Sequence, residues 1–279
     1  MTESTPRPDL FVDTQWLADH LDDPTIRIVD CDWPQGYAKA HIPGAVGHRT
    51  ANIFLKTGMR SPDDHELYAM GPDAFAALAS QWGIGPDTHV VAYDNRMGSY
   101  AARLVWTLTL YGHDRASVVD GGWVKWLAEE RRITQRFPRV EPTVFVPKRN
   151  DSWLATLDDV KAAIGAPDRA IFDVRARAEY DDSDSRGNRR AGHVPGAVHT
   201  EWSDLLTGET KVLRPRDELL AHLASLGITP DKQVITHCQA GIRASHSWLV
   251  LRALGFRNVR NYDASMAEWA NRDDTPLER

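Results

Sequence analysis

Residues 233–254 read QVITHCQAGIRASHSWLVLRAL, a short apolar run, a six-residue loop and an apolar segment of helical length. This order predicts a buried strand over Gln233–His237, a loop over Cys238–Arg243 and a helix over Ile242–Leu254. A loop that opens a helix directs several backbone N–H groups at one point, and the helix N-terminus adds partial positive charge. A thiol at Cys238 would therefore ionise readily and act as a nucleophile.

Arg243 ends the same loop and adds a permanent cation with a planar set of donors that suit an anion. A lone cysteine after an apolar strand is ordinarily a small buried hydrophobic residue. The adjoining glycine, arginine and helix start favour a functional thiol instead. We therefore expect an anionic sulfur centre that handles anionic substrates, with Cys238 as its catalytic residue.

Composition excludes several classes of protein. The 279 residues are 42% hydrophobic and 26% charged, with a net charge of −6, which suits one large or two ordinary globular domains. Such an acidic chain is not expected to bind nucleic acid or a membrane surface. No apolar run has the length of a membrane span, and the polar segment Met1–Asp9 lacks the pattern of a signal peptide. The only two cysteines, Cys31 and Cys238, exclude a disulfide scaffold, so a cytoplasmic location is expected.

The chain contains one pattern twice. Three pairs of segments match in the same order: 82–91 with 226–235, 41–46 with 193–198, and 120–126 with 263–269. The first pair has an offset of 144 residues (227 − 83), and the pair HIPGAV and HVPGAV has an offset of 152 (193 − 41), which indicates an insertion in the second copy. A period this long indicates a domain duplication rather than a solenoid.

Each copy alternates short apolar strands with helices. We expect strands at 26–29, 89–93, 117–119, 170–174, 233–237 and 258–262, and helices at 71–82, 99–111, 156–164, 216–226 and 242–254. The alternation predicts an α/β protein of two tandem domains, each a mostly parallel sheet covered by helices on both faces. The expected boundaries are 1–134 for the first domain, 135–151 for a charged, proline-bearing linker and 152–279 for the second domain. Ligands of such sheets bind at the C-terminal ends of strands, where Cys238 lies.

The two copies differ at the loop. Asp94 stands at the position of Cys238 (238 − 94 = 144), in the loop Asp94–Ser99. An aspartate cannot form a persulfide, so we expect the first domain to be structural. The alternative is a separate carboxylate active site there, although no partner acid or metal-ligand cluster stands out near Asp94 in the sequence.

Together these features resemble the tandem-domain rhodanese family, which includes the thiosulfate and 3-mercaptopyruvate sulfurtransferases. The resemblance covers essentially the whole chain. It rests on the doubled His-(Ile/Val)-Pro-Gly-Ala-Val motif, the loop Cys238–Arg243, and the ending Asn261-Tyr262-Asp263 with Glu268-Trp269. It implies two rhodanese-like domains, the first inactive and the second catalytic. It also implies a persulfide on Cys238, whose sulfur is ringed by the backbone amides of Gln239, Ala240, Gly241, Ile242 and Arg243.

The loop also bears on the substrate. Cysteine phosphatases that share this fold have five residues between cysteine and arginine, whereas this loop has four, from Gln239 to Ile242. The tighter loop suits one sulfur atom better than a tetrahedral phosphate. Loops of the mercaptopyruvate type resemble Cys-Gly-Ser/Thr-Gly-Val-Thr without charge, so Arg243 favours thiosulfate as the donor. Gln239 stands where thiosulfate enzymes often carry a basic residue, and 3-mercaptopyruvate therefore stays the alternative donor.

A second group of residues is expected beside the loop. In the family the segment Asp173-Val174-Arg175 lies there, so Arg175 is a candidate substrate-binding residue, and a buried Asp173–Arg175 brace is the alternative. Glu179 replaces an arginine that contacts substrate in some vertebrate relatives, which leaves more of the anion binding to Arg243. Trp202 is a candidate pocket-lining residue. The insertion 186–190 contributes three arginines that either form a solvated face or reach the site: Arg186, Arg189 and Arg190.

The histidines and the second cysteine are assigned structural roles. His237 precedes Cys238 and so points to the opposite face of the strand, which favours a core histidine over a general base. His41 and His193 recur in both copies, including the inactive one. Cys31 is expected to be an inert packing thiol.

The implied reaction is a two-step sulfur transfer in which the Cys238 thiolate takes the outer sulfur of thiosulfate and passes it to a thiophilic acceptor, such as cyanide or a thiol. No metal or organic cofactor is implied. The expected partners are a small-molecule sulfur donor and acceptor, with no nucleic acid and no membrane. A protein acceptor is the alternative, in which the chain would be a persulfide carrier docking a partner.

Overall fold

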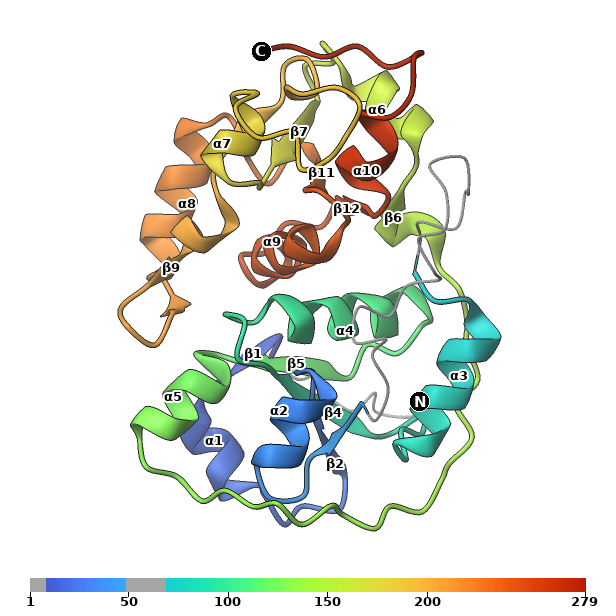
Figure 1. The fold of residues 1–279 in the computed structure, drawn as a ribbon, viewed down its shortest axis with the longest axis vertical. Helices are drawn as coiled ribbons and strands as arrows, with labels where there is room; N and C mark the ends of the chain where they lie inside the picture. Colours follow the sequence, from blue (N-terminus) through green and yellow to red (C-terminus); the bar gives the residue numbers. More distant parts are fainter. Residues whose placement is uncertain (1–8, 49–68) are drawn as a thin grey trace. The chain divides into compact units, whose positions relative to one another are not determined.

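A computed structural model describes residues 9–48 and 69–279, and the N-terminal residues 1–8, part of the segment tested above for a signal peptide, lie outside the described residues. The chain separates into two compact units, one containing residues 9–48 and 72–149 and the other residues 150–279. Figure 1 colours the first unit from blue to green and the second through yellow to red.

The first unit is built on a parallel sheet. Its elements are β1 (Phe11–Val12), α1 (Thr14–Asp19), β2 (Ile26–Asp30), α2 (Pro34–Lys39), β3 (Val46–Gly47), α3 (Pro72–Gln81), β4 (His89–Tyr93), α4 (Ser99–Leu110), β5 (Ala116–Val119) and α5 (Gly122–Ala128). The five strands lie in the order β1-β5-β4-β2-β3, and all neighbours are parallel.

The second unit repeats this architecture with additions. Its elements are η1 (Asp151–Trp153), β6 (Leu154–Ala155), α6 (Leu157–Ala163), β7 (Arg169–Asp173), α7 (Arg177–Tyr180), β8 (Val198–His199), η2 (Trp202–Leu205), β9 (Leu206–Thr207), β10 (Val212–Leu213), α8 (Arg216–Ser225), β11 (Gln233–His237), α9 (Ile242–Ala253), β12 (Val259–Tyr262) and α10 (Ser265–Trp269). The sheet order β6-β12-β11-β7-β8 has the topology of the first sheet, and β9 and β10 form a separate antiparallel hairpin. The predicted duplication and the α/β class are therefore confirmed.

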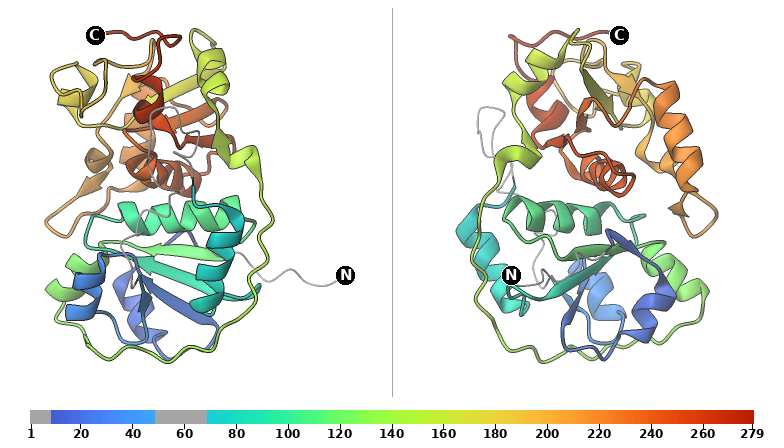
Figure 2. Two further views of the ribbon diagram at one scale, coloured as in Figure 1. Left: turned by 45° about the vertical axis from the view of Figure 1, so that its right-hand side comes forward. Right: turned by 180° about the vertical axis from the view of Figure 1, so that it is seen from behind.

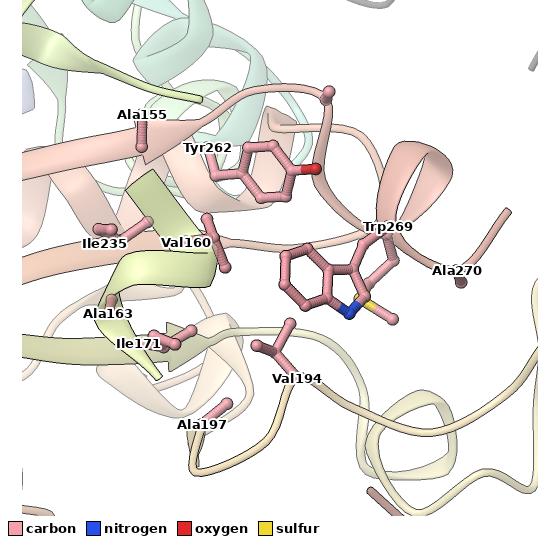
Figure 3. Close-up of a cluster of buried hydrophobic side chains, with 12 residues drawn as sticks. Ala155, Val160, Ala163, Ile171, Val194, Ala197, Ile235, Tyr262, Trp269 and Ala270 are labelled. Carbon is pink, nitrogen blue, oxygen red and sulfur yellow. The ribbon is translucent and has the colours of Figure 1, made fainter. Parts of the chain in front are cut away.

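Helices cover both faces of the second sheet, as Figure 2 shows. On one face α9 packs against β11 and β12, and Arg216 of α8 donates to the carbonyls of Ala253 and Leu254 at the end of α9. On the other face α6 and α10 bury Val160 and Trp269 against Ile235 of β11 (Figure 3). Because both faces are covered, the residues 234–237 of β11 are all buried, although only Val234 and Ile235 are apolar. The sheet is thus a rigid base for the groups at its strand ends.

The predicted longer elements agree with the structure to within one residue at each end. The elements that the sequence analysis missed are short, such as the edge strands β1, β3, β6 and β8, each of two residues. Two residues give no period-two signal, so their pairing depends on the neighbouring strand rather than on local pattern. Within the described residues, no helix combines the length and apolarity needed to cross a membrane.

Candidate active site

Cys238 lies directly after β11, the central strand of the second sheet, at the C-terminal edge. Its side chain is buried. The first residues of α10 bind the backbone of the loop through two hydrogen bonds. Met266 N–H donates to the Cys238 carbonyl at 3.1 Å, and Ala267 N–H donates to the Gln239 carbonyl at 2.9 Å. The backbone that carries the Cys238 side chain is therefore fixed by β11 and α10.

Gly241 is the turning point between the loop and α9. It is the N-cap of the helix, with a left-handed φ of 74°. A Cβ atom at this position would lie 2.2 Å from Asp263 Oδ1 and 2.6 Å from the Asp263 carbonyl oxygen. Only glycine satisfies both the backbone angle and the close approach.

Ser265 anchors the loop through its hydroxyl, a role that the sequence analysis missed. Its Oγ accepts the N–H groups of Cys238 and Gly241, each at 3.1 Å, and donates to the Tyr262 carbonyl at 2.7 Å. The residue is fully buried, with a φ of 54°. The repeat contains an indication of this unusual backbone. The residue of the first copy that corresponds to Ser265 is a glycine, Gly122 (265 − 122 = 143), and its φ is also positive, at 50°.

The first domain shows that this arrangement of loop and helix holds an anion. Asp94 follows β4 as Cys238 follows β11, and its carboxylate is buried. The two oxygens accept N–H groups at 2.7–2.8 Å from four residues: Arg96, Gly98, Tyr100 and Ala101. Beside Cys238, the N–H groups of Gln239, Ala240 and Ile242 donate to no oxygen of the described part of the chain. Unpaired N–H groups at the start of a helix are available to an anion.

The two loops differ in length by one residue. Gly98 and Gly241 are equivalent, since each is the left-handed N-cap of the helix that follows the loop. Three residues separate Asp94 from Gly98, but only two separate Cys238 from Gly241. The catalytic loop is therefore the tighter of the two.

Arg243 has a buried partner that the sequence analysis did not assign. Its Nη1 and Nη2 donate to Glu179 Oε2 and Oε1 at 2.6 and 2.8 Å. Burial alone would lower the pKa of Arg243, but the hydrogen bonds that it donates to Glu179 and the proximity of Cys238 raise this pKa above its usual value. Arg243 is thus a permanent cation placed between a carboxylate and the reactive thiol.

The three arginines of the insertion 186–190 have different environments. Arg190 donates to carbonyl groups of Trp269, Ala270 and Thr275, and Arg189 pairs with Asp273. Arg186 is 55% exposed, and its Nε lies 3.9 Å from Glu179 Oε1. Of these three, Arg186 is the one that extends toward the loop.

The same insertion is tied to the loop by amide side chains. Asn188 and Gln239 exchange two hydrogen bonds, of 3.0 and 2.9 Å, and Asn271 Nδ2 donates to Asn188 Oδ1 at 3.0 Å. The side chain of Gln239 is therefore occupied within the protein. Its backbone N–H donates to no oxygen of the described residues.

Arg175 forms the brace that the sequence analysis kept as an alternative. It is 2% exposed, and it donates to both oxygens of Asp173 and to the Gly192 carbonyl. Its expected role in substrate binding does not fit this burial.

His237 is fully buried with Nε2 3.7 Å from Asp173 Oδ2, and burial lowers its pKa to about 4. Trp202 is buried edge-on against His246 at 5.2 Å, so it supports α9.

Asp94 does have acidic neighbours, contrary to the sequence analysis. Asp30 and Asp32 are buried near it at the ends of paired strands, and Tyr93 Oη donates to Asp30 at 2.6 Å. Burial and the other two carboxylates raise the pKa of Asp32 to about 7. Even so, no group of three His, Cys, Asp or Glu side chains in the described ranges has a metal-binding arrangement.

Comparison with known proteins identifies the fold family. The profile described as "Rhodanese-like domain" matches residues 13–129 and again residues 156–272. The chain belongs to the rhodanese family. Its duplicated parallel sheet therefore corresponds to two tandem rhodanese-like domains. The crystal structure of YnjE superposes on this rhodanese with a TM-score of 0.84 at 23% identity, covering 97% of this chain and 69% of that one.

Relatives of similar length carry three different names. The thiosulfate sulfurtransferase of Azotobacter vinelandii is 32% identical, over 96% of this chain and 97% of that protein. The sulfur carrier protein TtuD of Thermus thermophilus is 34% identical, over 97% and 96%. The 3-mercaptopyruvate sulfurtransferase of Escherichia coli is 31% identical, over 96% and 97%. This rhodanese is therefore a sulfurtransferase, and the relatives leave its donor open.

Proposed function

We propose that the chain transfers the outer sulfur of thiosulfate to a thiophilic acceptor through a persulfide on Cys238. The observation that carries this proposal is the placement of Cys238 among loop amides and against Arg243, in the arrangement that holds the Asp94 carboxylate in the first domain. Backbone N–H groups and a guanidinium are the groups that stabilise negative charge on the sulfur atoms during transfer.

The proposed chemistry has two steps. The Cys238 thiolate attacks the outer sulfur of thiosulfate, the new S–S bond forms, the S–S bond of thiosulfate breaks, and sulfite leaves with that electron pair. Cyanide or a thiolate then attacks the outer sulfur of the persulfide, and the Cys238 thiolate is released. The nucleophile of the first step is the thiolate itself, and the scheme assigns no general base to a side chain.

Binding of the sulfur donor is assigned to groups that still have N–H donors available. Arginine has five N–H donors, and the pair with Glu179 uses one on each of two nitrogens, so Arg243 retains donors for the sulfonate oxygens or the sulfur. The loop amides stabilise the negative charge that moves between the sulfurs. Arg186, more than half exposed, supplies a second cation at the edge of the site.

Two alternatives have support from relatives. The name of the Escherichia coli relative favours 3-mercaptopyruvate as donor, and the name of TtuD favours a carrier that discharges its persulfide to a protein. The comparison of kcat/KM for thiosulfate and for 3-mercaptopyruvate on one preparation separates the donors. Rapid turnover with cyanide or a small thiol argues against an obligate carrier.

A mass measurement tests the persulfide itself. Protein incubated with thiosulfate is expected to gain the mass of one sulfur atom, and cyanide is expected to remove it. A peptide map must place the added sulfur on Cys238. No gain in mass, or a gain on Cys31, contradicts the proposal.

A further inference from the structure

Glu179 is a buried carboxylate fixed against the cation of the catalytic loop. It is 3% exposed, while the Arg243 side chain is 22% exposed. Besides its two bonds from Arg243, its Oε2 accepts the N–H of Ala176 at 3.2 Å, so it is also tied to the start of α7. The carboxylate is therefore held in place and cannot be replaced by solvent without breaking three hydrogen bonds.

This pairing changes the charge that a substrate meets. The loop sequence alone indicates one uncompensated cation, Arg243, beside the sulfur. In the structure the charge of Glu179 offsets it, so the pair contributes no net charge. Arg186 is near the pair but is 55% exposed, and solvent screens its field. An incoming donor thus meets a thiolate and a nearly balanced ion pair.

We propose that Glu179 is a specificity-determining residue that lowers the preference of the site for dianionic over monoanionic sulfur donors. The inference rests on the proposed function, because it takes the donor to bind beside Cys238. Thiosulfate carries two negative charges at neutral pH and 3-mercaptopyruvate carries one carboxylate. The Coulomb repulsion from Glu179 scales with the donor charge and is therefore about twice as large for thiosulfate.

The test removes the charge and keeps the shape. In Glu179→Gln, the ratio of kcat/KM for thiosulfate to that for 3-mercaptopyruvate is expected to rise roughly 5- to 20-fold, mainly through a lower KM for thiosulfate. Glu179→Asp retains the charge and should leave the ratio within about twofold, even where a shortened side chain lowers kcat. Glu179→Met is a second uncharged variant, which keeps the measurement accessible if one variant folds poorly.

Glu218→Gln is the matched control. Glu218 also accepts a hydrogen bond from an arginine, Arg214, at 3.2 Å, but it is 56% exposed on α8. The same loss of one charge at this surface pair should leave the donor ratio unchanged. An equal rise in both variants means that net charge, and not Glu179, sets the preference, and it overturns the proposal.

A second readout does not depend on the donor. Iodoacetate and iodoacetamide both alkylate a thiolate, but only iodoacetate is an anion, so the ratio of their rates at Cys238, read by peptide mapping, reports the local field. This ratio should rise several-fold in Glu179→Gln and stay constant in Glu218→Gln. If the alkylation ratio rises while neither protein uses thiosulfate, the charge role of Glu179 stands and the proposed donor fails. If both ratios are unchanged, Glu179 only braces Arg243 and the proposal is overturned.

Discussion

Asp94 in the first domain and Cys238 in the second stand at the same place after corresponding central strands. The Asp94 carboxylate accepts four backbone N–H groups of its own loop and helix, so it occupies the space among the loop amides of its domain. The equivalent site of the second domain is built around a thiol, which is an anion only when ionised. The duplication thus places a buried aspartate in one domain and, at the same position of the other domain, the thiol that we propose to carry the persulfide.

The first prediction concerns the two thiols. Cys238→Ser should abolish sulfur transfer, because a hydroxyl at this position forms no persulfide, and Cys31→Ser should keep most of the activity. Cys31 is buried, and burial together with Asp94, Asp30 and Asp32 raises the pKa of its thiol well above the usual value. Activity assays with thermal unfolding as the check on folding measure both variants. An inactive Cys31→Ser protein that is folded would contradict the assignment.

The second prediction concerns Arg243. A hydrogen bond to a charged group contributes about 1.5–3 kcal/mol, and about 1.4 kcal/mol corresponds to a tenfold rate factor. Arg243→Ala should therefore lower kcat/KM for thiosulfate roughly 10- to 100-fold, and the loss should be greater than for 3-mercaptopyruvate because Glu179 is left unneutralised. Arg243→Lys should recover part of the rate, since the charge returns without the planar fork.

Measurements of the free energy of unfolding distinguish a role of Arg243 in binding the donor from a role in shaping the loop. Arg243→Ala leaves the buried Glu179 carboxylate without its partner, which should lower the free energy of unfolding by a few kcal/mol. The double variant Arg243→Ala/Glu179→Ala should regain much of that stability but not the thiosulfate rate. Recovery of the rate in the double variant would show that Arg243 shapes the loop and does not bind the donor.

The third prediction concerns Ser265, whose hydroxyl holds the N–H groups of Cys238 and Gly241. Ser265→Gly removes these bonds but suits the positive φ, so we expect a roughly tenfold lower kcat with little change in stability. Ser265→Ala loses the bonds and keeps the strained backbone, so it should be about 1–3 kcal/mol less stable than the glycine variant. Urea unfolding and steady-state kinetics measure the two effects. Wild-type kcat in Ser265→Gly would exclude a positioning role for the hydroxyl.

The sequence was sufficient to predict the parts of the site that are local in the chain. The loop contains Cys238, Gly241 and the start of α9 within a few residues. Their geometry depends on the strand–loop–helix pattern, which is visible in the amino-acid sequence. The duplication also predicted two domains of the same α/β architecture, because two copies with one order of motifs are expected to fold alike. These predictions depend on short-range pattern, which is what a single sequence records best.

The partners that set the charge of the site come from distant segments. Glu179 is 64 residues from Arg243, and Asn188 is 51 residues from Gln239. Such pairs depend on how α7 and the insertion pack onto the loop, which no periodicity specifies. Asp30 and Asp32 could have been predicted, because β2 pairs with β4 and brings their ends together beside Asp94.

The last prediction concerns pH and these carboxylates. Burial, Asp30 and Asp94 raise the pKa of Asp32 to about 7, and burial raises that of Asp30 to about 6. A folded-state pKa above the unfolded value of about 3.9 means that the folded state binds the proton more tightly. The stability from this term is therefore fully present below about pH 4 and is lost as the pH rises to about 7.

Replacing Asp32 should remove the contribution of this residue to that pH dependence, whereas the contribution of Asp30 remains. In the wild-type structure the Asn95 N–H donates to Asp32 Oδ2 at 3.1 Å. Asp32→Asn keeps an oxygen that can accept this hydrogen bond, but it removes the charge. We expect the variant to exceed wild type by about 2–4 kcal/mol in unfolding free energy at pH 8 and to equal it near pH 4, since one pKa unit corresponds to about 1.4 kcal/mol. Urea unfolding at several pH values measures this difference, with the exposed Asp87→Asn as control. A constant difference between Asp32→Asn and wild type across that range would show that Asp32 is ionised throughout and that the acidic cluster binds no proton.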